Sequence, residues 1–243
     1  MQKYLFYCNL HYNILYYNIN VLLKITSRLI KYKKHNWSSK VSLFTALLFP
    51  LTLSAHPHAW VDTNTYIKSD DTHITALHMT WTFDAETSTY MLQGEDISAE
   101  KIDVTLQRLA ESVVGNMYNE HYFTYLYDGN TPVRYKEARH PQLIQDKNKL
   151  VLSFELPLSI PIAFKDKALK LYIYDETYFV DMSWIDKNNI QLSDQLTTKC
   201  TGELVAPKAS DELRAYTLSL ASDVALDNTI GQLFSQKYQL NCQ

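Results

Sequence analysis

The clearest strand pattern in the chain lies in residues 73–84 (HITALHMTWTFD), where apolar and polar residues alternate. One face of this predicted strand is expected to lie on the core and the other to be exposed. Residues 59–67 (AWVDTNTYI) alternate in the same way, and turn residues from Ser69 to Asp71 separate the two segments. The pattern therefore predicts a strand and its return strand, whose core positions include Leu77, Met79, Trp81 and Phe83. We also assign Trp60 to the core.

The spacing of apolar residues changes to three and four in residues 98–117, which is typical of a helix with one apolar stripe. Ser98 is the predicted N-cap, and Glu100 lies in the first turn, where the helix dipole favours an anion. The predicted stripe consists of Ile102, Leu106, Leu109, Val113 and Met117.

The rest of the chain continues these two patterns without an internal repeat or a low-complexity linker. The order of elements predicts a single α+β domain, with a mostly antiparallel β-sheet and two or three helices. Further strands are predicted at residues 122–127, 149–156, 168–174, 178–185 and about 238–242, and further helices at residues 209–221 and 228–236.

The N-terminal part has the pattern of a signal peptide. A basic segment at residues 31–40 (KYKKHNWSSK) precedes a short apolar segment at residues 41–53 (VSLFTALLFPLTL), and Ser54-Ala55 offers a small residue for cleavage. The apolar segment is shorter than the roughly 20 residues that span a bilayer. We predict that residues 31–55 are a signal peptide, that residues 1–30 reflect an over-extended start, and that residues 56–243 are exported to the periplasm. An uncleaved anchor or a core helix is the alternative.

The distribution of charge along the chain indicates what kind of ligand the exported part binds. Residues 1–55 hold seven of the 23 basic residues and none of the 26 acidic ones, so residues 56–243 are strongly acidic. Nucleic acid is excluded as a partner because phosphate contacts need clustered Lys and Arg. A cation is the more natural ligand.

The cysteines agree with export. Cys8 lies in the discarded segment, and Cys200 and Cys242 form an even pair that suits an oxidising compartment. No C-x-x-C pair is present, which argues against a zinc site made of thiolates. The sequence also lacks G-x-S-x-G, a glycine-rich phosphate loop and H-E-x-x-H, so we predict that the protein is not an enzyme.

Two histidines follow directly after the predicted cleavage site. After cleavage behind Ala55, the imidazole and the free α-amine of His56 could bind one metal, and Pro57 stiffens the turn that holds His58 nearby. Imidazoles combined with carboxylates suit zinc, and also nickel or copper. The alternative is a solvated terminus without a ligand role.

Three aspartates could supply the carboxylates. Asp62 shares strand parity with His58, and Asp84 lies at the same end of the sheet as His58 if the first two strands form a hairpin. Asp175 continues an apolar strand face, which is costly unless the carboxylate is paired or bound to metal. His78 shares the face of Asp84 but lies about 20 Å along the strand, so we interpret it as a surface residue.

Several of these motifs together resemble a known family. They are HPHAWVD (56–62), WTFD (81–84), YFT (122–124), YDETYFV (174–180) and the terminal cysteine pair. The chain is similar over residues 56–243 to periplasmic proteins of bacterial metal-transport systems. These are described as uncharacterised ABC-type transport components and include the ZevA-type zinc-uptake accessory proteins. Glu176 departs from the pattern, which often has proline there.

The resemblance implies a periplasmic zinc-binding partner of an inner-membrane metal permease of the nickel/cobalt-exporter-like type. It assigns the metal ligands to His56, His58, Asp84 and Asp175, and it implies a protein that is not itself transmembrane after signal cleavage. Two alternatives stay open. The histidine turn could dock the permease without binding metal, or an N-terminal histidine brace could hold copper for redox chemistry.

Overall fold

The first two strands form a long hairpin, β1 (Ala59–Ser69) and β2 (His73–Phe83), which confirms the predicted strand and return strand. The structure is a computed structural model, and it describes residues 59–219 and 230–243. The hairpin turn is closed by Asp70, whose carboxylate accepts hydrogen bonds from the backbone N–H groups of Thr72 (2.8 Å) and His73 (2.7 Å). The predicted leader, residues 1–55, lies outside the described residues.

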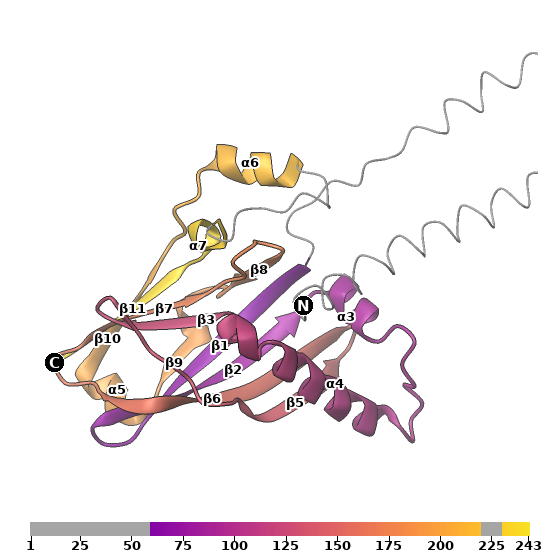
Figure 1. Ribbon diagram of the computed structural model, residues 1–243, viewed down its shortest axis with the longest axis horizontal. Helices are drawn as coiled ribbons and strands as arrows, with labels where there is room; N and C mark the ends of the chain where they lie inside the picture. Colours follow the sequence, from indigo (N-terminus) through magenta and orange to yellow (C-terminus); the bar gives the residue numbers. More distant parts are fainter. Residues whose placement is uncertain (1–58, 220–229) are drawn as a thin grey trace, which may run out of the picture. The chain divides into compact units, whose positions relative to one another are not determined.

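The hairpin lies in the middle of the larger of two sheets (Figure 1). The strand order is β5-β6-β2-β1-β8, and β9 also pairs with β1. Strands β8 and β9 run parallel to β1, one after the other along the same edge, while the remaining pairs are antiparallel. The added strands are β5 (Arg139–Asp146), β6 (Lys149–Ala163), β8 (Val180–Ser183) and β9 (Ile190–Leu192).

The second sheet is wholly antiparallel and has the order β10-β11-β7-β3-β4. Its strands come mainly from the C-terminal half of the chain, and β3 and β4 extend one edge. They are β3 (Thr124–Asp128), β4 (Thr131–Pro132), β7 (Ala168–Ile173), β10 (Cys200–Val205) and β11 (Lys237–Cys242).

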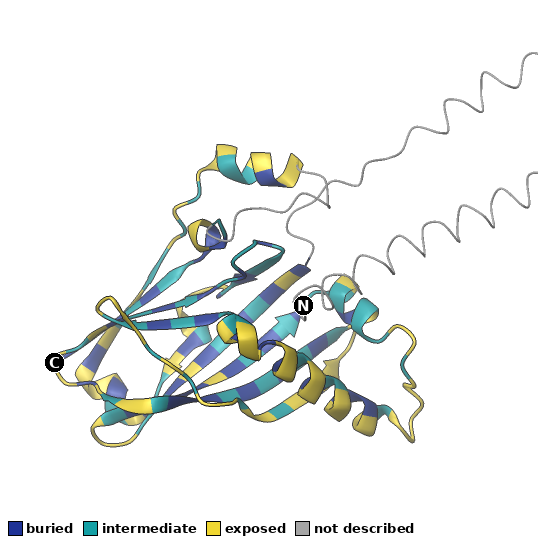
Figure 2. Ribbon diagram, viewed as in Figure 1, coloured by how far each residue is buried: buried dark blue, intermediate teal, exposed yellow. Residues whose placement is uncertain are grey.

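The two sheets share one hydrophobic core, and the strands of Figure 2 show buried positions alternating with exposed ones. The predicted core face of β2 is confirmed, because its four apolar odd positions are all buried. Ile67 and Leu77 of the larger sheet line the same small void, about 10 Å³, as Leu126, Leu171 and Tyr238 of the second sheet. Trp60, in contrast, is 47% exposed, so its assignment to the core is wrong.

The main helix, α4 (Ile102–Asn116), is present but differs in detail from the prediction. Its N-cap is Lys101, because Asp96 accepts hydrogen bonds from the N–H and hydroxyl of Ser98 and holds Ser98 in the preceding turn. The stripe is also rotated: Leu106 and Met117 are buried as predicted, but the other fully buried apolar positions are Ala110 and Val114.

Smaller helices complete the fold. The predicted C-terminal helices correspond to α6 (Asp211–Ser219) and α7 (Gly231–Phe234), which begin at Asp211 rather than residue 209 and at Gly231 rather than residue 228, and residues 220–229 lie outside the described residues. Helices α3 (Ala85–Met91) and α5 (Asp194–Lys199) and the 3₁₀ turn η3 (Lys187–Asn189) are not predicted by the sequence pattern. Within the two described ranges, no helix has the length and apolar character that crossing a membrane requires. The predicted α+β class with mostly antiparallel strands is confirmed.

A strained turn precedes β3. The predicted strand at residues 122–127 begins only at Thr124, because η2 (Tyr118–Phe123) ends in three consecutive residues with positive φ: His121 (50°), Tyr122 (54°) and Phe123 (51°). This left-handed conformation costs about 1–2 kcal/mol per residue without glycine. The buried side chain of Tyr122 anchors the turn, and its hydroxyl accepts a hydrogen bond from the Ala138 N–H at 2.9 Å.

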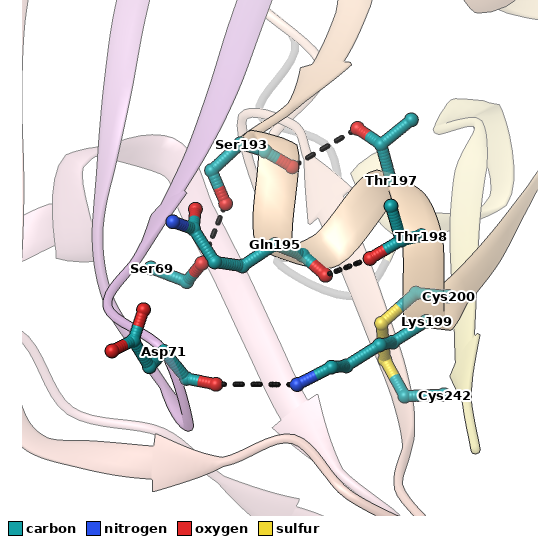
Figure 3. The surroundings of a disulfide bond; sticks show 9 residues. All are labelled: Ser69, Asp71, Ser193, Gln195, Thr197, Thr198, Lys199, Cys200 and Cys242. Carbon is teal, nitrogen blue, oxygen red and sulfur yellow. Dashed lines mark hydrogen bonds between the residues drawn. A yellow bond between two sulfur atoms is a disulfide. The ribbon is translucent and has the colours of Figure 1, made fainter.

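The predicted disulfide joins Cys200 and Cys242, which lie opposite each other on β10 and β11 (Figure 3). The same region is linked to the tip of the β1–β2 hairpin. Lys199 donates to the carbonyl of Asp71 at 3.4 Å, and the hydroxyls of Ser69 and Ser193 are 2.5 Å apart. The disulfide therefore lies at the far end of β1 from Ala59.

Candidate functional site

The predicted metal site lies at the other end of β1, where the described chain begins. His56 and His58 lie outside the described residues, and Ala59 is the residue directly after His58. Ala59 and Trp60 pair with Val180 and Asp181 of β8 on one side of β1. On its other side β1 meets β2, which ends next to Asp84.

Asp84 is bound directly to Trp60. Its carboxylate accepts the Trp60 N–H at 2.9 Å, and its own N–H donates to the Trp60 carbonyl at 3.0 Å. The carboxylate also caps helix α3, accepting from the N–H and the hydroxyl of Thr87 at 2.8 and 2.6 Å. The hairpin thus brings Asp84 to the end of the sheet at which residue 58 precedes β1.

The hydrogen bonds keep the Asp84 carboxyl ionised. Partial burial acts to raise its pKa, but the hydrogen bonds from Thr87, Trp60 and the Glu86 N–H outweigh burial, so the pKa lies below its ordinary value of 3.8. A partly buried anion is therefore bonded to Trp60, the second residue after His58 in the sequence.

Asp175 is fully buried, with 1% of its surface exposed, where it follows β7. Its carboxylate accepts hydrogen bonds from the N–H and hydroxyl of Thr177 and from the N–H groups of Phe179 and Val180, at 3.0–3.2 Å. These bonds fold the loop between β7 and β8. They also explain how the acid continues an apolar face, since a buried carboxylate is tolerated when it is hydrogen-bonded.

The two aspartates lie on opposite sides of the start of β1. Asp84 contacts Trp60 from the β2 side, whereas Asp175 contacts Val180, the β8 partner of Ala59. The two carboxylates therefore bind backbone N–H groups of two different strands, Asp84 on β1 and Asp175 on β8. In the part of the chain that the structure describes, no three His, Cys, Asp or Glu side chains gather closely enough to hold a metal ion.

The other residues considered for the site lie apart from it. Asp62 lies on the partly exposed face of β1, with a carboxylate oxygen 3.9 Å from the ammonium of Lys149. His78 is exposed, as predicted, in the middle of β2.

Sequence reasoning missed Asp181, which pairs with Trp60 across β1 and β8. Its carboxylate accepts a hydrogen bond from the Tyr178 hydroxyl at 3.1 Å. Burial raises its pKa above the ordinary value of 3.8, and the opposing effects of Tyr178 and the Arg214 guanidinium do not cancel that rise. The signal was a single acid inside the predicted strand at residues 178–185, which the parity of that strand alone does not distinguish from a surface residue.

Helix α7 packs on the loop between β7 and β8. The Tyr178 ring stacks on Phe234 with centroids 3.8 Å apart, and the guanidinium of Arg214 lies 5.5 Å from the Phe234 centroid. Gly231, the first residue of α7, donates its N–H to the Glu176 carbonyl at 3.0 Å. The loop that carries Asp175 is therefore fixed from both ends.

One protein-family model matches most of the chain. Residues 41–242 match the family described as "Protein of unknown function (DUF1007)". An uncharacterised protein of Haemophilus influenzae is 31% identical over 205 residues, which cover 83% of this chain and 98% of the relative. The chain therefore belongs to the DUF1007 family, whose function is unknown.

Proposed function

We propose that this protein is a periplasmic zinc-binding accessory protein that works with an inner-membrane metal permease in metal uptake. In this proposal the signal peptide is removed behind Ala55, and His56 becomes the first residue. The α-amine and imidazole of His56, the imidazole of His58 and a carboxylate of the folded domain then bind the ion. Nitrogen and oxygen ligands of this kind suit Zn²⁺.

One observation carries the proposal: the hydrogen bond between the Trp60 N–H and the Asp84 carboxylate. It fixes a carboxylate with a lowered pKa on Trp60, the second residue after His58 in the sequence. A carboxylate must be deprotonated to bind a metal, and Asp84 meets that condition well below neutral pH. The acidic composition of residues 56–243 adds a favourable field for a cation.

The hydrogen bonds of Asp175 favour an indirect role for it in the proposed site. Four donors from its own loop already approach its two carboxylate oxygens. In our proposal Asp175 holds Val180 against Ala59 and so fixes the exit point of the chain, while Asp84 supplies the oxygen ligand.

Two features support export and a partner in the membrane. The disulfide between Cys200 and Cys242 is typical of proteins in oxidising compartments. Trp60 is 47% exposed next to Asp84 and Asp181, and a large exposed aromatic side chain is a frequent anchor of protein interfaces. We propose that the permease, of the nickel/cobalt-exporter-like type, docks at this end of β1.

The test is a zinc titration of the mature protein, produced without an affinity tag and beginning at His56. We expect one zinc ion per chain, and we expect the double variant His56→Ala/His58→Ala to lose it. The matched control is His78→Ala/His140→Ala, which removes two exposed imidazoles elsewhere. A form with one extra residue before His56 should bind more weakly, because it moves the α-amine away.

Three results would contradict the proposal or select an alternative. Zinc binding that survives the His56/His58 double variant would remove these histidines from the site. Binding of the permease without any zinc binding would select the docking alternative. A copper(II) EPR signal together with turnover would select the redox alternative.

Two further variants separate the roles of the aspartates. Asp84→Asn should weaken zinc binding, whereas Asp175→Asn should lower the stability of the fold with little change in the zinc affinity of the folded molecules. Binding should also weaken below about pH 6, as the imidazoles become protonated. Unchanged affinity at pH 5 would count against imidazole ligands.

A further inference from the structure

A pocket of about 250 Å³ lies beside β3, and its lining includes Tyr174 and Glu176, the two neighbours of Asp175 in the sequence. Its walls come from the strained turn of η2, from β3, from the segment after β4 and from the residues after β7. The volume is below the roughly 300–1,000 Å³ that is usual for drug-sized ligands, so the pocket fits a small molecule or one side chain. The residues that matter here are His121, Tyr125, Arg134, Tyr135, Tyr174 and Glu176.

Aromatic rings form one wall of the pocket. Tyr125 and Tyr174 are stacked, with ring centroids 4.3 Å apart and an angle of 20° between the ring planes. His121 lies edge-on to Tyr125 at 6.0 Å. The faces of aromatic rings carry negative potential and attract cations.

A carboxylate adds to this negative potential. An oxygen of Glu176 lies 3.4 Å from the Tyr125 hydroxyl. Burial raises the pKa of both Tyr125 and Tyr174, and the negative charge of Glu176 raises both further. Arg134 also lines the pocket, but it is exposed and is not among the charges that shift either hydroxyl.

The pocket also contains a hydrogen-bonding atom without a partner. The Tyr135 hydroxyl oxygen is buried, and among the described residues it makes no hydrogen bond. Burial raises its pKa, and the Leu126 N–H offsets part of that effect without reaching hydrogen-bond geometry. Because this oxygen is closed off from solvent, it adds a polar group to the wall of the pocket but is not itself a contact for a ligand.

We propose that this pocket binds an organic ammonium or guanidinium cation. The cation lies against an outer face of the stacked Tyr125–Tyr174 pair, with Glu176 as its counter-ion. This activity is separate from zinc binding.

The test is an NMR titration of the tyrosine ring signals of the metal-free mature protein. Butylammonium serves as the free cation, and the peptide acetyl-Gly-Arg-Gly-amide presents the same chemistry as a protein side chain. Butanol and butyrate are the neutral and anionic counterparts. We expect saturable shifts of Tyr125 and Tyr174 with one or both cations and none with butanol or butyrate. Tighter binding of butylammonium would indicate a free metabolite as the natural ligand, and tighter binding of the peptide would indicate a side chain of a protein partner.

Variants check which groups bind the cation. Glu176→Gln and Tyr125→Leu should each weaken binding about tenfold, within the range of a cation–π contact or a local ion pair. The controls are Glu203→Gln on β10 and Tyr172→Leu on β7, which make the same chemical changes outside the pocket and should leave binding unchanged. The proposal fails if no cation gives saturable shifts, if butanol binds as well as butylammonium, or if butyrate binds and Arg134→Gln abolishes that binding.

Discussion

Carboxylates at the start of β1 bind backbone N–H groups, and this sets what each can do. Asp84 holds Trp60 and caps α3, and Asp175 folds the loop before β8. Asp181 differs from both, because its carboxylate accepts a hydrogen bond from a side chain, the Tyr178 hydroxyl, and partial burial raises its pKa. At this end of the sheet, the carboxylates of Asp84 and Asp175 therefore stabilise the fold, whereas the charged form of Asp181 costs free energy on burial.

The cost of Asp181 gives a pH-dependent prediction. The folded pKa of Asp181 lies above the ordinary value of 3.8, so at neutral pH folding carries a penalty for keeping this half-buried carboxyl charged. Asp181→Asn keeps an oxygen acceptor for Tyr178 and removes that charge. We expect the variant to unfold at a higher temperature than the natural protein at pH 7, and the difference to disappear as the pH falls below 3.8.

Thermal unfolding followed by circular dichroism at pH 7, 5 and 3.5 measures this difference. An equal melting temperature at pH 7 would show that Arg214 fully compensates the buried charge. The conservative change Tyr178→Phe removes the hydrogen bond to Asp181 and should lower the melting temperature at pH 7.

Helix α7 and the β7–β8 loop pack so closely at Gly231 that there is no room for a side chain on this residue. Gly231 begins α7, and a β-carbon placed there would lie 1.8 Å from the carbonyl oxygen of Asp175 and 2.9 Å from that of Glu176. Both neighbours are backbone atoms, which cannot rotate away. The contact between these two elements therefore requires glycine.

Gly231→Ala is expected to destabilise the protein by about 1–3 kcal/mol, as overpacking does. Gly115→Ala in α4 is the matched control, because a β-carbon there meets no atom within 4 Å and alanine is the better helix former. Urea unfolding measures both variants. A Gly231→Ala protein as stable as the natural one would show that α7 can shift away from the loop.

At the scale of the whole molecule, two sheets share one core and the disulfide closes the second sheet. Cys200 and Cys242 are 42 residues apart in sequence and join the edge strand β10 to β11. The segment between the two cysteines includes the helices α6 and α7, and both helices are short. The bridge is therefore expected to contribute much of the stability of the C-terminal part.

The double variant Cys200→Ala/Cys242→Ala should be less stable by about 4 kcal/mol, the chain-entropy value for a loop of this length. Urea unfolding of the variant and of the reduced natural protein measures the loss, and the two should agree. A loss below about 1 kcal/mol would mean that the unfolded chain keeps this region together without the bridge.

Sequence reasoning worked best where one local pattern decides the structure. Alternation identified β2 and its buried face, and parity identified Asp175 as an acid on an apolar face. It failed where distant contacts decide: Tyr122 and Phe123 have strand-like side chains, but the bond between the Tyr122 hydroxyl and Ala138 holds them in a left-handed turn. It also could not place Asp181, because only the parallel pairing of β1 with β8 brings that residue beside Trp60.

The position of β1 has a mechanical consequence. This strand is bonded on both sides, to β2 along one edge and to β8 and then β9 along the other. A pulling force applied to the chain ahead of Ala59 acts along the strand axis, so these ladders resist in shear, with many bonds sharing the load at once. A partner that binds the chain ahead of Ala59 would therefore hold the domain by a strand that is hydrogen-bonded on both sides. Under such a load the domain is expected to stay folded.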